Sequence, residues 1–509
     1  DPTPMGAPTA AASDAADTSA LAETELGPGP DFALAPQLTA PEVTMRLDVP
    51  GTGMALTTGV GDLDGDGYGD FAAQGREYIN GTQYVHIRYG GPRAASPEEQ
   101  FVLEQSGARL IVGPFTEAMI AAIVPAGDVD GDGFDDLLVG LGRCDAAQTG
   151  EGAYLLYGGP ERLSGARRFD EVGVLLRSPR EPDTSGEYSS CYVEMDPWVA
   201  GLGDFDGDGF DDFVLSEPQP GDTVEPASLY LFYGSAQRLS KGASWLEADA
   251  VLQAPGNTIP TAIGDVNADG TADLLLSTLV GDLASIFIPG RSERWQGEID
   301  AASSGTNIGH LLPFTVTGTG IPDPAFNPIL LSPPDVDGDG VADLMFWGDE
   351  NVLLYGRPGL FEGGVDLAEG IVLQNDADRL SELWFAGDRD GDGDADLVTR
   401  FYDDTFQFSD VAFSGGSRTR ASGNLSFPVQ TVLTANPEGY LHEQFRRLER
   451  MTLAGDLDGD GADDLLTTSS MYTPINDTDD PLDDEGFWVD APELHIHYGV
   501  LGTSSTPLR

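Results

Sequence analysis

Aspartate recurs in a fixed pattern along this 509-residue sequence. The pattern is Asp-x-Asp-x-Asp-Gly-x-x-Asp, and it occurs seven times, once with Asn in place of an Asp. We number its residues as positions 1 to 9 and the copies as loops 1 to 7. Calcium prefers six to eight hard oxygen ligands. The oxygens at positions 1, 3, 5 and 9, together with the position-7 carbonyl, predict one calcium site per loop, or about seven ions.

The predicted ligands follow the chain in seven sets of five, each with its position-7 residue fourth. They are Asp62, Asp64, Asp66, Tyr68 and Asp70 in loop 1; Asp128, Asp130, Asp132, Phe134 and Asp136 in loop 2; Asp204, Asp206, Asp208, Phe210 and Asp212 in loop 3; Asp265, Asn267, Asp269, Thr271 and Asp273 in loop 4; Asp335, Asp337, Asp339, Val341 and Asp343 in loop 5; Asp388, Asp390, Asp392, Asp394 and Asp396 in loop 6; Asp456, Asp458, Asp460, Ala462 and Asp464 in loop 7.

A helical EF-hand shares the start of this pattern but needs a bidentate glutamate at position 12. None of the seven copies has an acid there, and the residues that follow position 9 are β-like runs such as 137–139. Position 6 is glycine in every copy, which suits a sharp turn with positive φ. The pattern therefore predicts a calcium loop that ends where a strand begins. The alternative is that the aspartates only make Asx-turns.

Two copies differ from the rest in charge. Loop 4 has Asn267 at position 3 and Ala268 where the other copies have glycine, so it is expected to bind calcium less tightly. Loop 6 has an additional acid, Asp394, at position 7. The remaining copies carry four carboxylates each at positions 1, 3, 5 and 9.

Short apolar runs surround every acidic loop. One run precedes it, one follows it, and a third ends in an aromatic residue and glycine, as in 154–158 and 230–234. A fourth run precedes the next copy; its instances are 101–103, 172–176, 251–253 and 371–374. Four strands repeated seven times predict an all-β, seven-bladed β-propeller of four-stranded antiparallel blades. Too few residues follow Gly499 for a last outer strand, so residues 43–49 are expected to close blade 7.

The composition along the sequence divides the chain into three parts. Residues 1–40 form a low-complexity arm that we expect to be flexible, residues 41–502 form the propeller, and 503–509 form a short tail. The formal net charge of −61 argues against nucleic-acid binding. No apolar run is long enough for a transmembrane helix. The start at Asp1 is explained by a removed signal peptide, although other trimming would explain it too.

The runs 127–140 and 152–158 together resemble the FG-GAP repeat family, typified by the N-terminal β-propeller of integrin α subunits. The resemblance extends over about residues 43–500 and is strong again at 203–215. It implies a seven-bladed propeller, calcium between strands 1 and 2 of a blade, and a role in adhesion or ligand binding. The Phe-Gly phrase before the loop is degraded in this sequence, and the Gly-Ala-Pro phrase after it is mostly absent.

Longer insertions are expected on the face opposite the calcium loops, at 141–152, 179–196, 216–228, 400–410 and 468–492. Aromatic residues there could bind a protein or glycan ligand or only pack their own loops; they are Tyr188, Tyr192, Tyr402, Tyr472, Phe487 and Trp488. Cys144 and Cys191 are expected to form a disulfide, which would suit an oxidising compartment, with two free thiols as the alternative.

Catalytic motifs are not recognisable in the sequence. Of the five histidines, His86, His310, His442, His495 and His497, the last two are spaced for a metal pair, although strand packing explains them better. Three functions therefore stay open. The favoured one is a secreted or cell-surface adhesion or ligand-binding scaffold, and the alternatives are a carbohydrate-binding lectin and a polysaccharide-processing propeller enzyme.

Overall fold

A computed structural model describes most of the chain between Val43 and Gly499. The described residues are 43–46, 52–53, 56–77, 82–93, 100–102, 107–114, 119–142, 152–179, 199–216, 227–254, 258–278, 285–301, 312–314, 316–317, 335–346, 351–361, 365–375, 381–402, 409–414, 424–427, 445–473 and 487–499. The expected arm at 1–40 and tail at 503–509 lie outside these residues.

The described chain is all-β, with very little helix, and forms mainly antiparallel sheets of which several have four or five strands. We call the sheet that carries loop n sheet n. Their strands are β3 (Thr57–Gly61), β4 (Asp70–Glu77), β5 (Thr82–Arg88) and β7 (Ala108–Pro114) in sheet 1; β8 (Met119–Gly127), β9 (Asp136–Gly142), β10 (Gly152–Leu156) and β12 (Val174–Arg177) in sheet 2; β13 (Val199–Gly203), β14 (Asp212–Ser216), β15 (Ala227–Phe232) and β16 (Ala250–Ala254) in sheet 3; β17 (Thr258–Gly264), β18 (Asp273–Thr278), β19 (Ser285–Ile288) and β21 (Leu312–Phe314) in sheet 4; β23 (Leu344–Phe346), β24 (Asn351–Leu354) and β26 (Ile371–Asn375) in sheet 5; β27 (Ser381–Gly387), β28 (Asp396–Tyr402) and β29 (Ser409–Ser414) in sheet 6; and β31 (Phe445–Gly455), β32 (Asp464–Thr473), β33 (Phe487–His497) and β1 (Val43–Arg46) in sheet 7.

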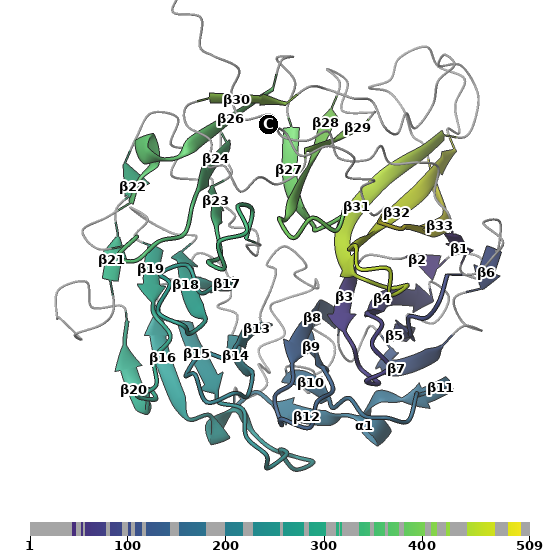
Figure 1. Cartoon of the computed structure of the whole chain (residues 1–509). Coiled ribbons are helices and arrows are strands. Elements are labelled where there is room, and N and C mark those ends of the chain that lie inside the picture. The colour runs from purple at the N-terminus through teal and green to yellow at the C-terminus, as the bar shows by residue number, and fades with distance from the viewer. Residues whose placement is uncertain are drawn as a thin grey trace, which may run out of the picture.

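Figure 1 shows these sheets arranged around a common centre, with successive sheets side by side, which is consistent with a propeller. The short remaining elements are β2 (Thr52–Gly53), β6 (Gln100–Val102), β11 (Gly165–Arg168), β20 (Gly297–Asp300), β22 (Val316–Thr317), β25 (Val365–Asp366) and β30 (Asn424–Phe427), the helix α1 (Phe169–Val172) and the 3-10 turns η2 (Trp245–Glu247) and η3 (Leu367–Glu369). No helix in the described part of the chain has the length and hydropathy needed to cross a membrane.

Strand β1 pairs antiparallel with β33, so that Val43 lies opposite Ile496 and Arg46 lies opposite Glu493. The N-terminal run therefore adds a strand to the last sheet, at the position expected from the sequence. The described strand ends at Arg46, and residues 47–49 of the predicted strand lie outside the described residues. The pairing joins segments from the two ends of the chain within one sheet.

One of the four predicted outer-strand runs is wrong. Residues 101–103 were expected to form the outer strand of sheet 1, but that place is taken by β7, which pairs with β5. The run instead contributes to β6, which lies parallel to β1 at the edge of sheet 7. The runs at 172–176, 251–253 and 371–374 do overlap the outer strands β12, β16 and β26.

Several sheets have an outermost parallel strand that the four-stranded pattern did not predict. Strand β11 lies parallel to β7, β20 parallel to β16, and β30 parallel to β26. Each comes from a later part of the sequence than the sheet it extends. These strands cover edges that would otherwise present unpaired backbone groups to solvent.

The apolar core lies between neighbouring sheets. Separate clusters of buried side chains join sheets 1 and 2, sheets 2 and 3, sheets 3 and 4, sheets 4 and 5, and sheets 7 and 1. The position-2 side chain of a loop takes part in these clusters: Phe205 of loop 3 is fully buried with Leu274 and Ile288 of sheet 4. Burying such a side chain contributes roughly 1.5–3 kcal/mol, so loops 1, 2, 3, 4 and 7, whose position-2 side chains belong to these clusters, are anchored against a neighbouring sheet.

Candidate metal centre

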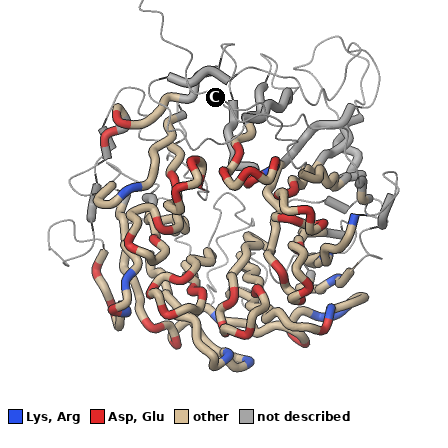
Figure 2. The backbone as a smooth tube through the Cα atoms, in the orientation of Figure 1, with Lys and Arg blue, Asp and Glu red and all other residues tan. Residues whose placement is uncertain are grey.

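The seven acidic loops share one backbone shape. Each begins after the first strand of its sheet where that strand is described, and position 9 begins or directly precedes the second strand. The position-6 glycines, Gly67, Gly133, Gly209, Gly270, Gly340, Gly393 and Gly461, all have φ between 88° and 92°. Position 4 also has positive φ in every loop, including 60° at Ala268 of loop 4, a strained value for a residue with a Cβ atom. Figure 2 shows these acidic turns recurring from sheet to sheet.

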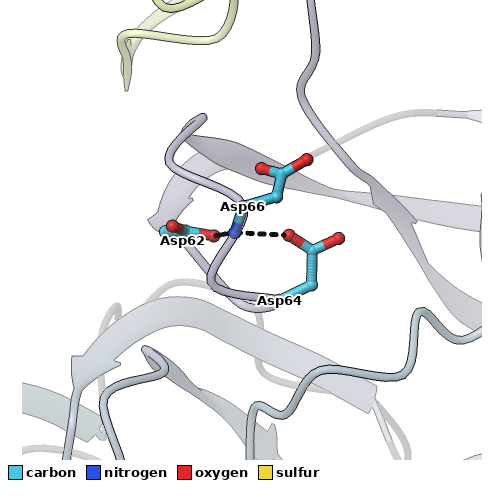
Figure 3. Close-up of side chains that lie close together, drawn as sticks. All are labelled: Asp62, Asp64 and Asp66. Carbon is cyan, nitrogen blue, oxygen red and sulfur yellow. Dashed lines mark hydrogen bonds between the residues drawn. The ribbon is translucent and has the colours of Figure 1, made fainter.

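The position-1 carboxylate is held by backbone N–H groups of its own loop. In loop 1, Asp62 Oδ1 accepts from the N–H groups of Gly65 (2.7 Å) and Asp66 (3.1 Å), and Oδ2 accepts from Gly67 (2.8 Å). Asp64 Oδ1 also accepts from the Asp66 N–H (3.3 Å), as Figure 3 shows. These bonds fix the loop around its carboxylates.

The position-9 carboxylate is fully buried in every loop. In loop 2, Asp136 accepts from the position-2 N–H of Val129 (3.0 Å) and from the N–H of Gly158 (2.8 Å). Gly158 ends the aromatic-glycine run, so this carboxylate ties the loop to the third strand of its sheet. Burial raises the pKa of Asp136 to about 8, and likewise raises the pKa of Asp70 in loop 1 to about 7. A bound cation would favour the ionised form that burial disfavours.

The structure brings many of the predicted ligand residues together. Carboxylate oxygens lie within 4.8 Å of one another at positions 1, 3 and 5 of loops 1, 5 and 6, and at positions 1, 3 and 9 of loops 2 and 3. The position-7 residue lies against its loop, since its N–H donates to the position-5 carboxylate; the Tyr68 N–H, for example, lies 3.1 Å from Asp66 Oδ1. In loop 4, Asn267 Nδ2 donates to Asp273 Oδ1 (3.1 Å).

These residues fit a calcium ion by their chemistry. The donor set consists of carboxylate oxygens, which calcium prefers over nitrogen or sulfur ligands. Asp130 at position 3 of loop 2 also has a buried Oδ1 that has no hydrogen-bond partner. A buried carboxylate oxygen without a partner is costly, and a metal ion would remove that cost.

Neighbouring loops are joined to each other through their backbones. The position-8 N–H of each loop donates to the position-1 carbonyl of the preceding loop, over 2.7–3.1 Å, and loop 1 donates in the same way to loop 7. The pairs are Gly69 to Asp456, Asp135 to Asp62, Asp211 to Asp128, Ala272 to Asp204, Ala342 to Asp265, Ala395 to Asp335 and Asp463 to Asp388. Every loop is therefore both a donor and an acceptor in one series.

Aspartate at position 8 adds a second link that the sequence did not predict. Asp135 Oδ2 accepts from the N–H of Asp62 (2.6 Å), and Asp211 and Asp463 do the same for loops 2 and 6. Gly61, with φ of 76°, leaves the space for this carboxylate, since a Cβ atom there would lie 2.0 Å from Asp135 Oδ2. Loops 1, 4, 5 and 6 have Gly or Ala at position 8 and cannot make this bond.

Three arginines that each contact two carboxylates of a loop were also missed, and a fourth, Arg93, contacts position 3 of loop 7 with its Nε 3.5 Å from Asp458 Oδ2. Arg162 donates to Asp64 and Asp66, Arg238 to Asp130 and Asp132, and Arg294 to Asp206 and Asp208. Each of these three arginines reaches back from the following sheet to positions 3 and 5 of a loop. A local signal exists, because each lies four residues after the glycine that ends the aromatic-glycine run, at Gly158, Gly234 and Gly290.

The remaining predicted residues do not form a second described site. His86 is fully buried against the edge of Tyr84, with ring centroids 4.8 Å apart, and burial lowers the pKa of His86 to about 3. His497 Nε2 lies 3.0 Å from Thr467 Oγ1, and the His495 and His497 rings are 6.4 Å apart between centroids.

Part of the predicted ligand-binding surface is strand and not loop. The run 468–492 was expected to be an insertion, but β32 continues to Thr473 and β33 begins at Phe487, with Tyr472 paired opposite Trp488. Tyr402 ends strand β28. Cys144, Cys191, Tyr188, Tyr192, His310 and His442 lie outside the described residues.

The comparisons with known proteins match this repeated loop. A model of the FG-GAP repeat matches residues 197–231, which contain loop 3 and parts of strands β13 to β15. This match and the two integrin matches that follow support a relationship between the chain and integrin-like FG-GAP proteins. Integrin alpha-4 of Xenopus laevis is 26% identical over 190 residues, and integrin alpha-PS2 of Drosophila melanogaster is 40% identical over 174 residues.

The integrin matches are partial in both directions. They cover 36% and 31% of this chain, and 16% and 11% of the two integrins. Loop 3, inside the FG-GAP match, has the same backbone φ values and the same position-1 and position-9 hydrogen bonds as loop 1. The FG-GAP loop geometry thus recurs outside the residues that the family model matches.

Proposed function

We propose that the chain is a closed, seven-bladed FG-GAP propeller, stabilised by calcium in its seven acidic loops, that acts as an extracellular adhesion or ligand-binding scaffold. The observation that carries the proposal is the series of loop-to-loop hydrogen bonds, which runs through all seven loops and returns from loop 1 to loop 7. A closed series needs a ring of sheets, and the pairing of β1 with β33 supports the same closure.

Calcium supplies positive charge where each loop gathers carboxylates. The residues that would hold it are those at positions 1, 3, 5 and 9, with the position-7 carbonyl, and the protein's own part is to fix these oxygens through backbone N–H bonds. Extracellular calcium modules bind with dissociation constants of about 10⁻⁴–10⁻³ M. Loops of this kind would be filled outside cells, which supports a secreted or cell-surface location.

The proposed ligand surface is the face opposite the calcium loops, where a protein or glycan would bind. Loops carried on a rigid scaffold commonly hold the binding residues of a protein. The family resemblance supports a binding role over an enzymatic one, because integrin α chains are what the sequence matches. The propeller would then be the frame that presents these loops.

Calcium counting and calcium removal test this proposal together. The purified chain is dialysed against 10 mM calcium, its bound metal is measured by mass spectrometry, and its melting temperature is compared before and after chelation with EGTA. About seven calcium ions per chain and a melting temperature lowered by several degrees are expected. A chain that binds no calcium, or that melts unchanged after complete chelation, would refute the calcium role.

Ligand binding is tested separately on the calcium-loaded chain. Binding to a panel of extracellular-matrix proteins supports the scaffold function, and selective binding on a glycan array would favour the lectin. Turnover of an acidic polysaccharide would instead establish an enzyme and overturn the scaffold function.

A further inference from the structure

Arg162, Arg238 and Arg294 each connect one sheet to the acidic loop of the sheet before it. The guanidinium Nε contacts the position-3 carboxylate and Nη2 contacts the position-5 carboxylate. The position-3 side chains are nearly fully buried, at 2–4% exposed, whereas the arginines are 34–45% exposed. Each fork therefore covers a buried carboxylate from the solvent side.

The same arginines are held by tyrosines of the preceding sheet. The guanidinium carbon lies over the ring of Tyr89, Tyr157 or Tyr233, at 4.7–5.2 Å from the ring centroid. The hydroxyl of each tyrosine accepts the N–H of the residue after the arginine, over 2.9 Å in all three cases. The arginine is thus oriented by two contacts that do not involve the acidic loop.

At loop 4, the position equivalent to these arginines is not an arginine. The equivalent residue, four after Gly356, is Leu360, which is 3% exposed and packs in the core between sheets 4 and 5. Loop 4 is also the loop with Asn267 in place of a carboxylate. Loops 1, 2 and 3 each have four carboxylates at positions 1, 3, 5 and 9 and one arginine beside them. Loop 4 has three carboxylates at these positions and no arginine at the equivalent place. Counting positions 1, 3, 5 and 9 and the arginine, the formal charge is −3 in all four loops, and Asp135 and Asp211 each add a neighbouring carboxylate beside loops 1 and 2.

We propose that Arg162, Arg238 and Arg294 are positioning residues that act as built-in counter-cations of loops 1, 2 and 3. They offset carboxylate repulsion when calcium is absent, keep adjacent sheets joined, and weaken the calcium affinity of these loops. The inference rests on the proposed calcium function and adds that each of these metal sites is assembled from two neighbouring sheets.

The charge of the arginine matters more than its effect on loop shape. The loop shape is already fixed by backbone N–H bonds that do not depend on the arginine, to positions 1 and 5 in all three loops and also to position 3 in loops 1 and 3. The guanidinium lies on the carboxylates that a calcium ion would use, and two cations that share carboxylates repel each other. Because the arginines are partly exposed, solvent screens this repulsion, and we expect about a tenfold effect on calcium affinity.

The test compares calcium-free and calcium-loaded forms of the full chain. The triple variant Arg162→Gln/Arg238→Gln/Arg294→Gln removes the three charges and keeps hydrogen-bonding side chains. Arg291→Gln is the matched control, because Arg291 lies three residues before Arg294 but contacts Glu293 and the Trp295 ring. A triple Arg→Lys variant keeps the charge and loses the fork. The melting temperature of each is measured after chelation and during a calcium titration.

The Gln variant is expected to melt several degrees lower than wild type without calcium and close to wild type with saturating calcium. Its titration midpoint should lie at about tenfold lower calcium. The Lys variant should keep a midpoint near wild type, and Arg291→Gln should change neither property. If the Gln variant lost the same melting temperature in the calcium-free and calcium-loaded forms, the arginines would be packing residues only and the inference would be overturned. An unchanged or raised midpoint of its calcium titration would overturn the inference as well. If the wild type itself ignores calcium, the calcium function fails as well.

Discussion

Loops 1 to 3 and loop 4 have the same backbone path but balance their charges differently. Loops 1 to 3 keep four carboxylates and receive an arginine from the next sheet, while loop 4 replaces one carboxylate by Asn267 and receives Leu360. Asn267 Nδ2 donates to Asp273, so the amide supplies a hydrogen-bond donor within the loop, which an ionised aspartate at this position could not do. The comparison teaches that the loop shape is set by its backbone bonds, while the net charge can be adjusted by a residue in either sheet.

The largest expected effect is one that both kinds of loop should share. Asp136→Asn in loop 2 and Asp273→Asn in loop 4 each replace one acceptor oxygen by an NH₂ group that faces a backbone N–H. In saturating calcium, where the cation would keep position 9 ionised, leaving a buried donor unsatisfied and losing a charged acceptor should lower the free energy of unfolding by roughly 3 kcal/mol in either loop. Urea unfolding followed by circular dichroism measures the change.

Asp170→Asn is the matched control for these two variants. Asp170 is a surface carboxylate paired with Arg168 at 3.0 Å, and the variant is expected to leave the unfolding free energy almost unchanged because solvent screens this exposed pair. A large loss in loop 2 with almost none in loop 4 would contradict the view that position 9 does the same work in both loops.

The loops themselves could be predicted from sequence because their information is local. Nine consecutive residues supply the carboxylates, the positive-φ glycines and the strand start at position 9, and Gly67 and Asp70 show these features in loop 1. The pairing of β1 with β33 was also accessible, because the run at 43–49 lies before the first strand of sheet 1 and was expected to add a strand to the last sheet.

Contacts between sheets could not be predicted in the same way. Arg162 is 98 residues from Asp64, and its recurring place four residues after Gly158 does not indicate which acidic loop it contacts. The misplaced run at 101–103 has a similar cause: both it and β7 are apolar enough to form an outer strand, and the choice depends on which edge is free. Such choices depend on how the sheets are arranged, which the repeat pattern does not encode.

A smaller effect should follow from giving loop 4 the charge of its neighbours without their arginine. Asn267→Asp places a carboxylate 3.1 Å from Asp273, where the amide now donates. We expect the calcium-free chain to lose about 1–2 kcal/mol of unfolding free energy, and calcium to restore most of it. The readout is the urea midpoint with EGTA and with saturating calcium.

Asp206→Asn in loop 3 is the mirror-image control, since it removes the same charge from a loop that keeps Arg294. This variant should gain less stability from calcium than wild type does, the opposite of Asn267→Asp. If both variants changed the calcium response in the same direction, the charge comparison between loops 3 and 4 would be wrong.

The smallest effect concerns position 4, where loop 4 has alanine with φ of 60° and loop 3 has Gly207 with φ of 74°. Ala268→Gly should relieve strain and raise the free energy of unfolding by about 0.5–1 kcal/mol, since the relief exceeds the entropy that glycine adds to the unfolded chain. Gly207→Ala should lower it by about 1 kcal/mol, because its Cβ atom would meet only Thr271 Cγ2, at 3.3 Å, and the cost is mainly conformational. Urea midpoints of the two variants, measured in calcium, should move in opposite directions. Parallel shifts would mean that the two loops do not share one backbone path, and that their difference extends beyond charge.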